Sequence, residues 1–241
     1  MSRIKTTKRW HGVLRVVARP LLRATMRIEV VGLENLPATG PAILVSNHRS
    51  SQDPQILTSV VPRYVAWVAA EYMSRVPVSG WIMKKIGVVF VPTLSRGRAA
   101  AFYKQALGVL RNGELLGLFP EGEDYIFAND FTAPPAPFHR GFAALALRAG
   151  APVIPAAICP VEERLKPIQI PPSVRAELSQ AHDIDQIRMI PTYKVVRVVF
   201  GAPIQPQASA SNNSVAELTE RTRLVILDLI ERHGATKPTS T

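Results

Sequence analysis

A histidine and an aspartate lie five residues apart in a segment whose side chains could act as a general base. In the run Ala42-Ile-Leu-Val-Ser-Asn-His-Arg-Ser-Ser-Gln-Asp-Pro54, an apolar stretch ends at Ser46, and Asp53-Pro54 is a typical helix start with Asp as N-cap. His48 is therefore predicted to lie in a strand-to-helix turn. In such a turn Asp53 can accept a hydrogen bond from one imidazole nitrogen, which leaves the other nitrogen to take a proton from a hydroxyl.

A plainer interpretation of the same spacing is that Asp53 only caps the helix and that His48 is a polar loop residue. A His-x4-Asp pair arises by chance in about one chain in eight of this composition. On a continuous helix the two side chains would point about 140° apart and would not cooperate. The spacing alone therefore leaves both interpretations open.

A second loop whose side chains could take part in binding or catalysis follows the run Leu115-Leu-Gly-Leu-Phe119. Pro120 ends this apolar stretch, Gly122 favours a turn, and the acidic Glu121 lies between them. In open α/β sheets ligands bind beyond the carboxyl ends of the strands. Glu121 is thus a candidate binding residue, with an ordinary turn as the alternative.

The elements around these loops alternate between short apolar runs and helical patterns. The predicted strands are Ile28–Val31, Ala42–Ser46, Tyr64–Ala69, Val88–Val91, Leu115–Phe119, Val153–Ile158 and Lys194–Phe200. The predicted helices are Pro54–Val61, Gly80–Ile86, Arg98–Asn112, Arg140–Ala149 and Val215–His233. This order indicates one layered α/β domain over residues 28–234, with a mostly parallel central sheet flanked by helices. Residues 235–241 are expected to be a frayed tail.

The first 27 residues are predicted to form a basic amphipathic helix, bent at Pro20. They carry eight Lys and Arg, and residues 1–111 hold 17 basic residues against four acidic ones, although the whole chain has a net charge of +11. The apolar stripe comprises Trp10, Val13, Leu14, Val16, Val17, Leu21 and Leu22. Such a segment suits an anionic membrane surface, where each basic residue contributes about 1 kcal/mol. Docking on the domain is the plain alternative, whereas nucleic acid is disfavoured because no recognition motif accompanies the charge.

Composition narrows the class of protein further. With 241 residues and 47% hydrophobic content, the chain is long enough to bury one large core. Its single cysteine, Cys159, excludes an internal disulfide framework, fits a reducing compartment and has no Cys or His cluster that would indicate a metal site. No uncharged apolar run reaches the ~20 residues of a membrane-spanning helix, and the N-terminus lacks the apolar core of a signal peptide. We therefore expect peripheral attachment at the cytoplasmic face of a membrane.

Taken together, the loops resemble those of the glycerolipid acyltransferases typified by lysophosphatidic acid acyltransferase. Asn47-His48-x4-Asp53 resembles the catalytic block of that family, and Phe119-Pro120-Glu121-Gly122 resembles its acceptor-binding block. Further matches in order and spacing are Gly87–Val91, Phe138-His-Arg-Gly141 and Val153-Ile-Pro155. The resemblance covers roughly residues 32–158, about half of the chain.

The resemblance implies transfer of a fatty acyl group from acyl-CoA or acyl carrier protein to a hydroxyl-bearing lipid acceptor such as a lysophospholipid. In that scheme His48 is the base, Asp53 orients it, and no metal or other cofactor takes part. Glu121 and Gly122 would belong to the acceptor site, while Phe119, Pro120 and Pro155 would contact the acyl chain or support the structure. The expected partners are the acyl donor, the lipid acceptor and an anionic membrane surface, and not nucleic acid. A catalytically silent lipid-binding protein on the same scaffold is the alternative.

Two positions depart from the family pattern. Glu123-Asp124 and Pro92-Thr93 stand where the family commonly has arginines that bind the acceptor phosphate. Arg96 and Arg98 are the candidate replacements for that phosphate clamp. Because carboxylates oppose a dianion, we expect an acceptor range that is not limited to lysophosphatidic acid.

Overall fold

A seven-stranded sheet forms the centre of the described part of the molecule. The computed structural model describes residues 2–92, 99–122, 134–167, 170, 172, 175, 189–207 and 214–234. The strand order is β1-β7-β6-β2-β5-β3-β4, and every neighbouring pair is parallel except β6 and β7. The strands are β1 (Arg27–Val31), β2 (Ala42–Ser46), β3 (Val65–Ala70), β4 (Val89–Val91), β5 (Leu115–Leu118), β6 (Val153–Pro167) and β7 (Met189–Phe200). The predicted fold class is confirmed.

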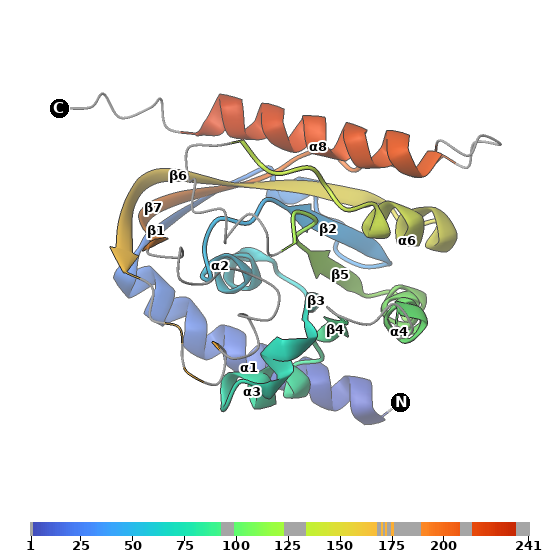
Figure 1. Cartoon of the computed structure of the whole chain (residues 1–241), viewed down its shortest axis with the longest axis horizontal. Coiled ribbons are helices and arrows are strands. Elements are labelled where there is room, and N and C mark those ends of the chain that lie inside the picture. Colours follow the sequence, from blue (N-terminus) through green and yellow to red (C-terminus); the bar gives the residue numbers. More distant parts are fainter. Residues whose placement is uncertain are drawn as a thin grey trace.

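Helices cover both faces of this sheet, with α8 along one side and α1 on the opposite side (Figure 1). They are α1 (Ser2–Thr25), α2 (Asp53–Val60), α3 (Ser79–Lys85), α4 (Ala99–Arg111), α6 (Gly141–Ala149) and α8 (Ser214–His233), with 3-10 turns η1 (Leu33–Asn35) and η2 (Glu71–Arg75). Alternate residues of β2 enter different cores: Ile43 packs with α4, α6 and α8, whereas Leu44 packs with α2. A strand covered on both faces is expected to be a nearly continuous apolar run, as β2 is from Ala42 to Val45.

The largest difference from the predicted elements is the length of β6 and β7. The predictions ended at Ile158 and began at Lys194, but the two strands continue together as an antiparallel ribbon as far as Pro167 and Met189. In β6 this extension is polar and mostly exposed, with charged residues such as Glu162 and Lys166. It lacks the apolar alternation of a half-buried strand, so the sequence pattern does not reveal it.

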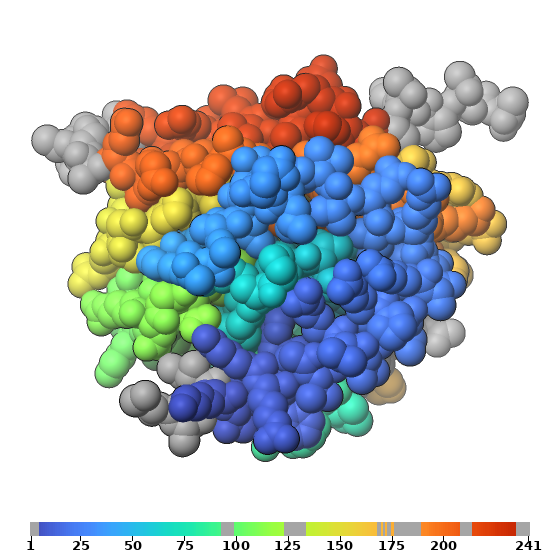
Figure 2. All heavy atoms as spheres, turned by 180° about the vertical axis from the view of Figure 1, so that it is seen from behind, coloured from blue at the N-terminus to red at the C-terminus, as the bar shows by residue number. Residues whose placement is uncertain are grey.

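Helix α1 is both docked on the domain and partly unpartnered. His11 is buried, Leu22 packs against the core, and Met26 directly after the helix is buried as well. The side chains of Trp10, Val13, Val16, Val17 and Leu21 are exposed, and the helix continues through Pro20. Figure 2 shows α1 crossing the lower part of one face of the molecule. Of the two interpretations left open for this segment, docking therefore holds for one side of the helix only. Within the described ranges, no helix combines the length and the apolar character needed to cross a bilayer.

Candidate active site

The loops that follow β2 and β5 meet at one edge of the sheet. The two strands are parallel neighbours, with Val45 paired to Leu118, so their carboxyl ends lie side by side. On its other side β2 pairs with β6, which brings Ser46 next to Ala156. The His48 turn is therefore enclosed between the Glu121 loop and the central strands.

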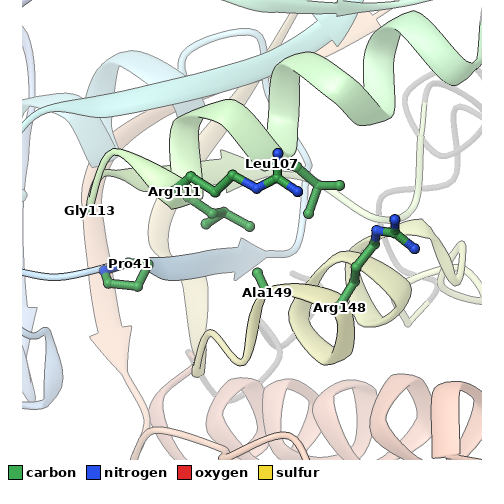
Figure 3. Close-up of a pocket in the computed structure, with 7 residues that line it drawn as sticks. Pro41, Leu107, Arg111, Gly113, Arg148 and Ala149 are labelled. Carbon is green, nitrogen blue, oxygen red and sulfur yellow. The ribbon is translucent and has the colours of Figure 1, made fainter.

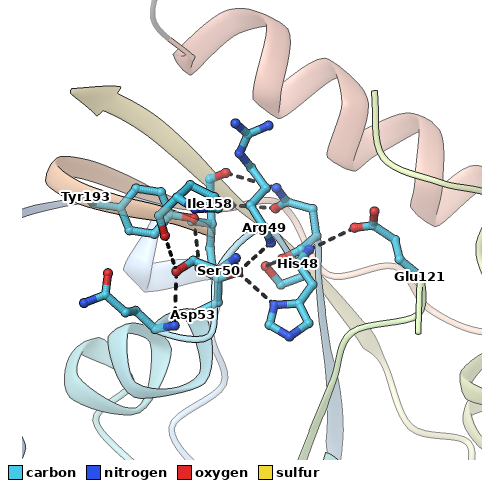
Figure 4. A network of polar contacts seen from close by, with 11 residues as sticks. His48, Arg49, Ser50, Asp53, Glu121, Ile158 and Tyr193 are labelled. Atoms are coloured by element: carbon cyan, nitrogen blue, oxygen red, sulfur yellow. Dashed lines mark hydrogen bonds and ion pairs between the residues drawn. The ribbon is translucent and has the colours of Figure 1, made fainter. Parts of the chain in front are cut away.

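His48 and Asp53 form the predicted hydrogen bond, with 2.8 Å between His48 Nδ1 and Asp53 Oδ2 (Figure 4). The Asp53 side chain is fully buried. Its Oδ2 also accepts hydrogen bonds from the backbone N–H groups of Arg49 (2.7 Å) and Ser50 (2.8 Å). Because Nδ1 faces the carboxylate, Nε2 is the ring nitrogen left to take a substrate proton.

The predicted N-cap role of Asp53 is wrong. Gln52 is the N-cap of α2, and Asp53 is the first residue of the helix. The Asp53 carboxylate turns back to the preceding loop, where three donors meet one of its oxygens. The interpretation of Asp53 as only a helix cap is thereby contradicted.

A buried asparagine fixes the start of the turn. The Asn47 side chain donates to the Ile158 carbonyl (3.0 Å) and accepts from the Ile158 N–H (2.7 Å). This pair of bonds ties the turn to β6 as a backbone ladder would. Ser50 completes the anchoring because its hydroxyl donates to the Pro191 carbonyl of β7 at 2.7 Å.

Aromatic rings hold the His48 imidazole from one side. Phe119 stacks on it with 4.1 Å between ring centroids, and Phe119 in turn stacks on the buried Trp67 at 5.4 Å. The His48 side chain retains 16% of its exposure, so the ring is oriented by the protein yet reachable from outside. Phe119 thus has a supporting contact that its place in the sequence block did not specify.

Glu121 is buried and joins two loops. Its Oε1 accepts from the His48 backbone N–H (2.9 Å), and its Oε2 accepts from the Ala136 N–H (3.0 Å). Burial raises the pKa of Glu121 to about 7, against the opposing effect of these two hydrogen bonds. Gly122 follows with φ of 72°, in the left-handed region that favours glycine. The carbonyl of Pro120 accepts a hydrogen bond from the His139 N–H at 2.8 Å.

The structure brings His48, Asp53, Phe119 and Glu121 together at this edge. Pro155 lies within β6, paired with Val45, and belongs to the sheet that supports the site. Arg96, Arg98, Glu123 and Asp124 lie outside the described residues, so the predicted phosphate clamp has no structural account.

Sequence reasoning missed Tyr193, whose hydroxyl donates to Asp53 Oδ1 at 3.0 Å. It is 140 positions away from Asp53, and no local pattern links the two. A tyrosine next to the predicted strand Lys194–Phe200 is the one signal that was available.

A separate hollow of about 320 Å³ lies at the opposite edge of the sheet, near the start of β2 and β5 (Figure 3). It is lined by Pro41, Leu107, Leu110, Arg111, Gly113, Arg148 and Ala149. Arg111 and Arg148 are in the last turns of α4 and α6, where cations stabilise the negative end of the helix dipole. These arginines are therefore explained without a ligand.

Comparison with known proteins gives matches over the segment that contains these loops. A family model described as Acyltransferase matches residues 27–159. The 1-acyl-sn-glycerol-3-phosphate acyltransferase of Borreliella burgdorferi is 30% identical over 132 residues, which are 55% of this chain and 51% of that protein. The enzyme of the same name from Saccharomyces cerevisiae is 31% identical over 132 residues, or 54% of this chain and 42% of that protein. The chain thus spans about half the length of these relatives or less.

A solved structure supports the fold over nearly the whole chain. The crystal structure of the 1-acyl-sn-glycerophosphate acyltransferase PlsC from Thermotoga maritima superimposes with a TM-score of 0.67. The match covers 96% of this chain and 81% of the other, at 20% sequence identity. The likeness therefore extends beyond the matched family segment and includes the C-terminal strand and helix.

Proposed function

Because the chain belongs to the acyltransferase family, we propose that it transfers a fatty acyl group from a thioester to the hydroxyl of a lipid acceptor at a membrane surface. The observation that carries the proposal is the His48 to Asp53 hydrogen bond at the carboxyl ends of β2 and β5. The buried carboxylate orients a partly exposed imidazole, as general-base catalysis requires. The donor is acyl-CoA or acyl carrier protein.

In the proposed mechanism, His48 Nε2 takes the proton of the acceptor hydroxyl while the hydroxyl oxygen attacks the thioester carbonyl carbon. A tetrahedral intermediate forms and then collapses with cleavage of the carbon–sulfur bond. The imidazolium returns its proton to the departing thiolate, so the enzyme ends unchanged. Asp53 stabilises the imidazolium throughout. General-base catalysis contributes about 10²- to 10⁴-fold in rate, and alignment of the two substrates supplies much of the rest.

The loop of Pro120, Glu121 and Gly122 would border the acceptor. Both Glu121 oxygens already accept backbone hydrogen bonds, which favours a role in shaping this border over direct contact with the lipid. Phe119 would limit the site on the side of the imidazole, and Pro155 would support it from within the sheet.

The acceptor range follows from charge. A phosphomonoester carries nearly two negative charges at neutral pH, and each carboxylate about 4 Å away would cost roughly 4 kcal/mol at an effective dielectric constant of about 20, before screening. Glu123 and Asp124 therefore favour zwitterionic or phosphate-free acceptors. If instead Arg96 or Arg98 forms the phosphate clamp, lysophosphatidic acid will be the preferred acceptor.

Action at a membrane surface is supported by exposed apolar side chains on α1 and α3. Trp10 of α1 and Trp81 of α3 are both about half exposed and contact each other edge to face, with 5.9 Å between ring centroids. Val78, just before α3, is 73% exposed. Lys85 lies 5.5 Å from the Trp81 ring centroid, so a cation borders the apolar group. Tryptophan flanked by lysine is typical of a side that contacts lipid headgroups.

The proposed activity can be tested with purified protein on vesicles. Oleoyl-CoA or oleoyl-acyl carrier protein would be supplied with lysophosphatidic acid, lysophosphatidylcholine, lysophosphatidylethanolamine and monoacylglycerol in competition, and products identified by mass spectrometry. We expect an acylated product from at least one acceptor, without exclusive use of lysophosphatidic acid. Exclusive use of lysophosphatidic acid that disappears in Arg96→Ala or Arg98→Ala would contradict the acceptor prediction. Lysolipid binding without any product would support the silent lipid-binding alternative.

A further inference from the structure

Tyr193 is the residue of β7 that reaches the candidate dyad. Its side chain is 4% exposed, and its hydroxyl lies 3.0 Å from Asp53 Oδ1. The other carboxylate oxygen, Oδ2, accepts from His48, Arg49 and Ser50. Tyr193 therefore satisfies the side of the carboxylate that the His48 turn does not reach. It also lies outside the segment matched by the family model, residues 27–159.

An irregularity in the sheet directs Tyr193 to this position. In the β6–β7 ribbon Pro160 pairs with Val196, Glu162 with Val195 and Glu163 with Tyr193, so the register shifts twice. Val161 is an extra residue in β6, and Lys194 is an extra residue in β7. Side chains in a regular strand alternate between faces, and Tyr193 and Val196 would then point in opposite directions. Here Tyr193 shares one apolar cluster with Val196 and Phe200 of β7 and with Ile56 of α2. The extra residue in β7 thus turns the phenol to the face where Asp53 lies, as bulges near functional sites often do.

The surroundings of Asp53 make this contact electrostatically important. A fully buried carboxylate keeps its charge only when donors replace the lost water. Burial raises the pKa of Tyr193 well above its ordinary value, so its hydroxyl stays protonated and remains a donor. Among the described residues, the charged groups near the dyad include Glu121 on the β5 side and the Arg49–Glu163 ion pair, with 3.0 Å between Arg49 Nη2 and Glu163 Oε1.

We propose that Tyr193 is a positioning residue for acyl transfer, holding Asp53 ionised and facing His48 through its bond to Oδ1. The inference rests on the proposed function of the dyad. It adds a third member from the C-terminal part of the chain, which the two sequence blocks do not contain. Ser50, bonded to the Pro191 carbonyl two residues earlier in β7, fixes the distance between the turn and this strand.

The test is a Tyr193→Phe variant, which keeps the ring and removes the donor. Without the tyrosine hydroxyl, the negative charge of Asp53 is less stabilised, so the His48–Asp53 pair binds a proton more tightly. The acidic limb of the kcat/KM profile then moves to higher pH. NMR titration of the His48 ring in the ligand-free protein should show the same direction of change. Tyr64→Phe is the matched control, since it removes a hydroxyl that donates to the Ile86 carbonyl away from the site. A His48 titration that is unchanged or displaced to lower pH would overturn the proposal.

A double-mutant cycle separates positioning from general destabilisation. With oleoyl-CoA and the acceptor identified by the vesicle assay, Tyr193→Phe should lower kcat about ten- to a hundredfold, the scale of a charge-assisted hydrogen bond, with little change in KM. In an Asp53→Asn background the same substitution should have little further effect, because its target is already lost. Fully multiplicative losses would overturn the proposal. Failure of the proposed function would appear differently, as a missing product in the wild type while the NMR titration still responds to Tyr193→Phe.

Discussion

The edge of the sheet that holds His48 and the outer side of α1 and α3 depart from ordinary burial in opposite ways. At the sheet edge two carboxyl groups, Asp53 and Glu121, are almost completely buried, and their oxygens are hydrogen-bonded. On α1 and α3 large apolar side chains, Trp10 and Trp81 among them, face outward. Buried charge and clustered exposed apolar surface each lower the stability of a folded protein, and where they occur they commonly mark a functional site. The proposed transfer from a thioester to a membrane lipid would need both, a base held by buried groups and a side that contacts lipid.

The largest expected effect at the buried edge is that of Asp53→Asn. The neutral asparagine amide cannot accept all the hydrogen bonds that reach Oδ2 of Asp53, and it does not stabilise an imidazolium. We therefore expect kcat to fall about 10²- to 10⁴-fold. Initial rates on vesicles at constant pH measure this loss. Asp228→Asn is the matched control, because Asp228 is exposed on α8 and pairs with a neighbouring helix residue, Arg232. An Asp53→Asn enzyme with wild-type kcat would show that the buried carboxylate is structural.

Glu121→Gln should change how stability depends on pH. The folded-state pKa of about 7 is above the unfolded value of 4.5, so the folded protein binds the extra proton between these values. This contribution is fully present below about pH 4.5 and is lost as pH rises through about 7, a total on the order of 3 kcal/mol at most. Glutamine does not titrate, so the variant should lose this slope.

Urea unfolding at a series of pH values from about 4.5 to about 8 compares the two proteins. The difference in free energy of unfolding between wild type and Glu121→Gln should favour the variant progressively more as pH rises. A constant difference across the range would mean that Glu121 does not titrate differently in the folded and unfolded states.

Phe119→Leu tests whether the aromatic stack orients the base. Leucine keeps an apolar side chain but loses the planar contact with the His48 ring at 4.1 Å. We expect kcat to fall about tenfold, since stacked pairs contribute about 0.5–1.5 kcal/mol beyond burial. Phe102→Leu, on α4, is the control because its ring contacts Tyr103 and not the site. Equal rates for both variants would exclude an orienting role for the stack.

The smallest expected effect concerns the exposed side. Replacing Trp10 and Trp81 by serine should weaken binding to vesicles with anionic lipid about three- to tenfold, in proportion to the apolar area removed from the headgroup region. Co-sedimentation measures the bound fraction, and higher salt should weaken it further. Point substitutions are preferable to deletion of α1, because His11 within the helix and Met26 beyond it are buried. Leu224→Ser, an exposed position on α8, should bind as the wild type does; equal binding by all three proteins would exclude this surface.

How far the sequence predicts the structure differs between these regions for a physical reason. The bounds of β2 and the His48 to Asp53 bond follow from local signals, an apolar run and a turn within a few residues. Tyr193 does not, because its contact depends on an irregular pairing of β6 with β7, in which an extra residue in β7 reverses the alternation of faces. The local sequence also does not show which side of α1 docks on the domain. Leu21 and Leu22 have the same side chain, but Leu22 packs against the core and Leu21 is exposed.

His48→Ala tests the central claim most directly, with turnover of oleoyl-CoA and the identified acceptor measured on the same vesicles for variant and wild type. The account predicts that product formation falls to the background rate while the circular dichroism spectrum and vesicle binding stay as in the wild type, because the imidazole is partly exposed. Unchanged turnover in a natively folded His48→Ala protein would contradict the dyad mechanism.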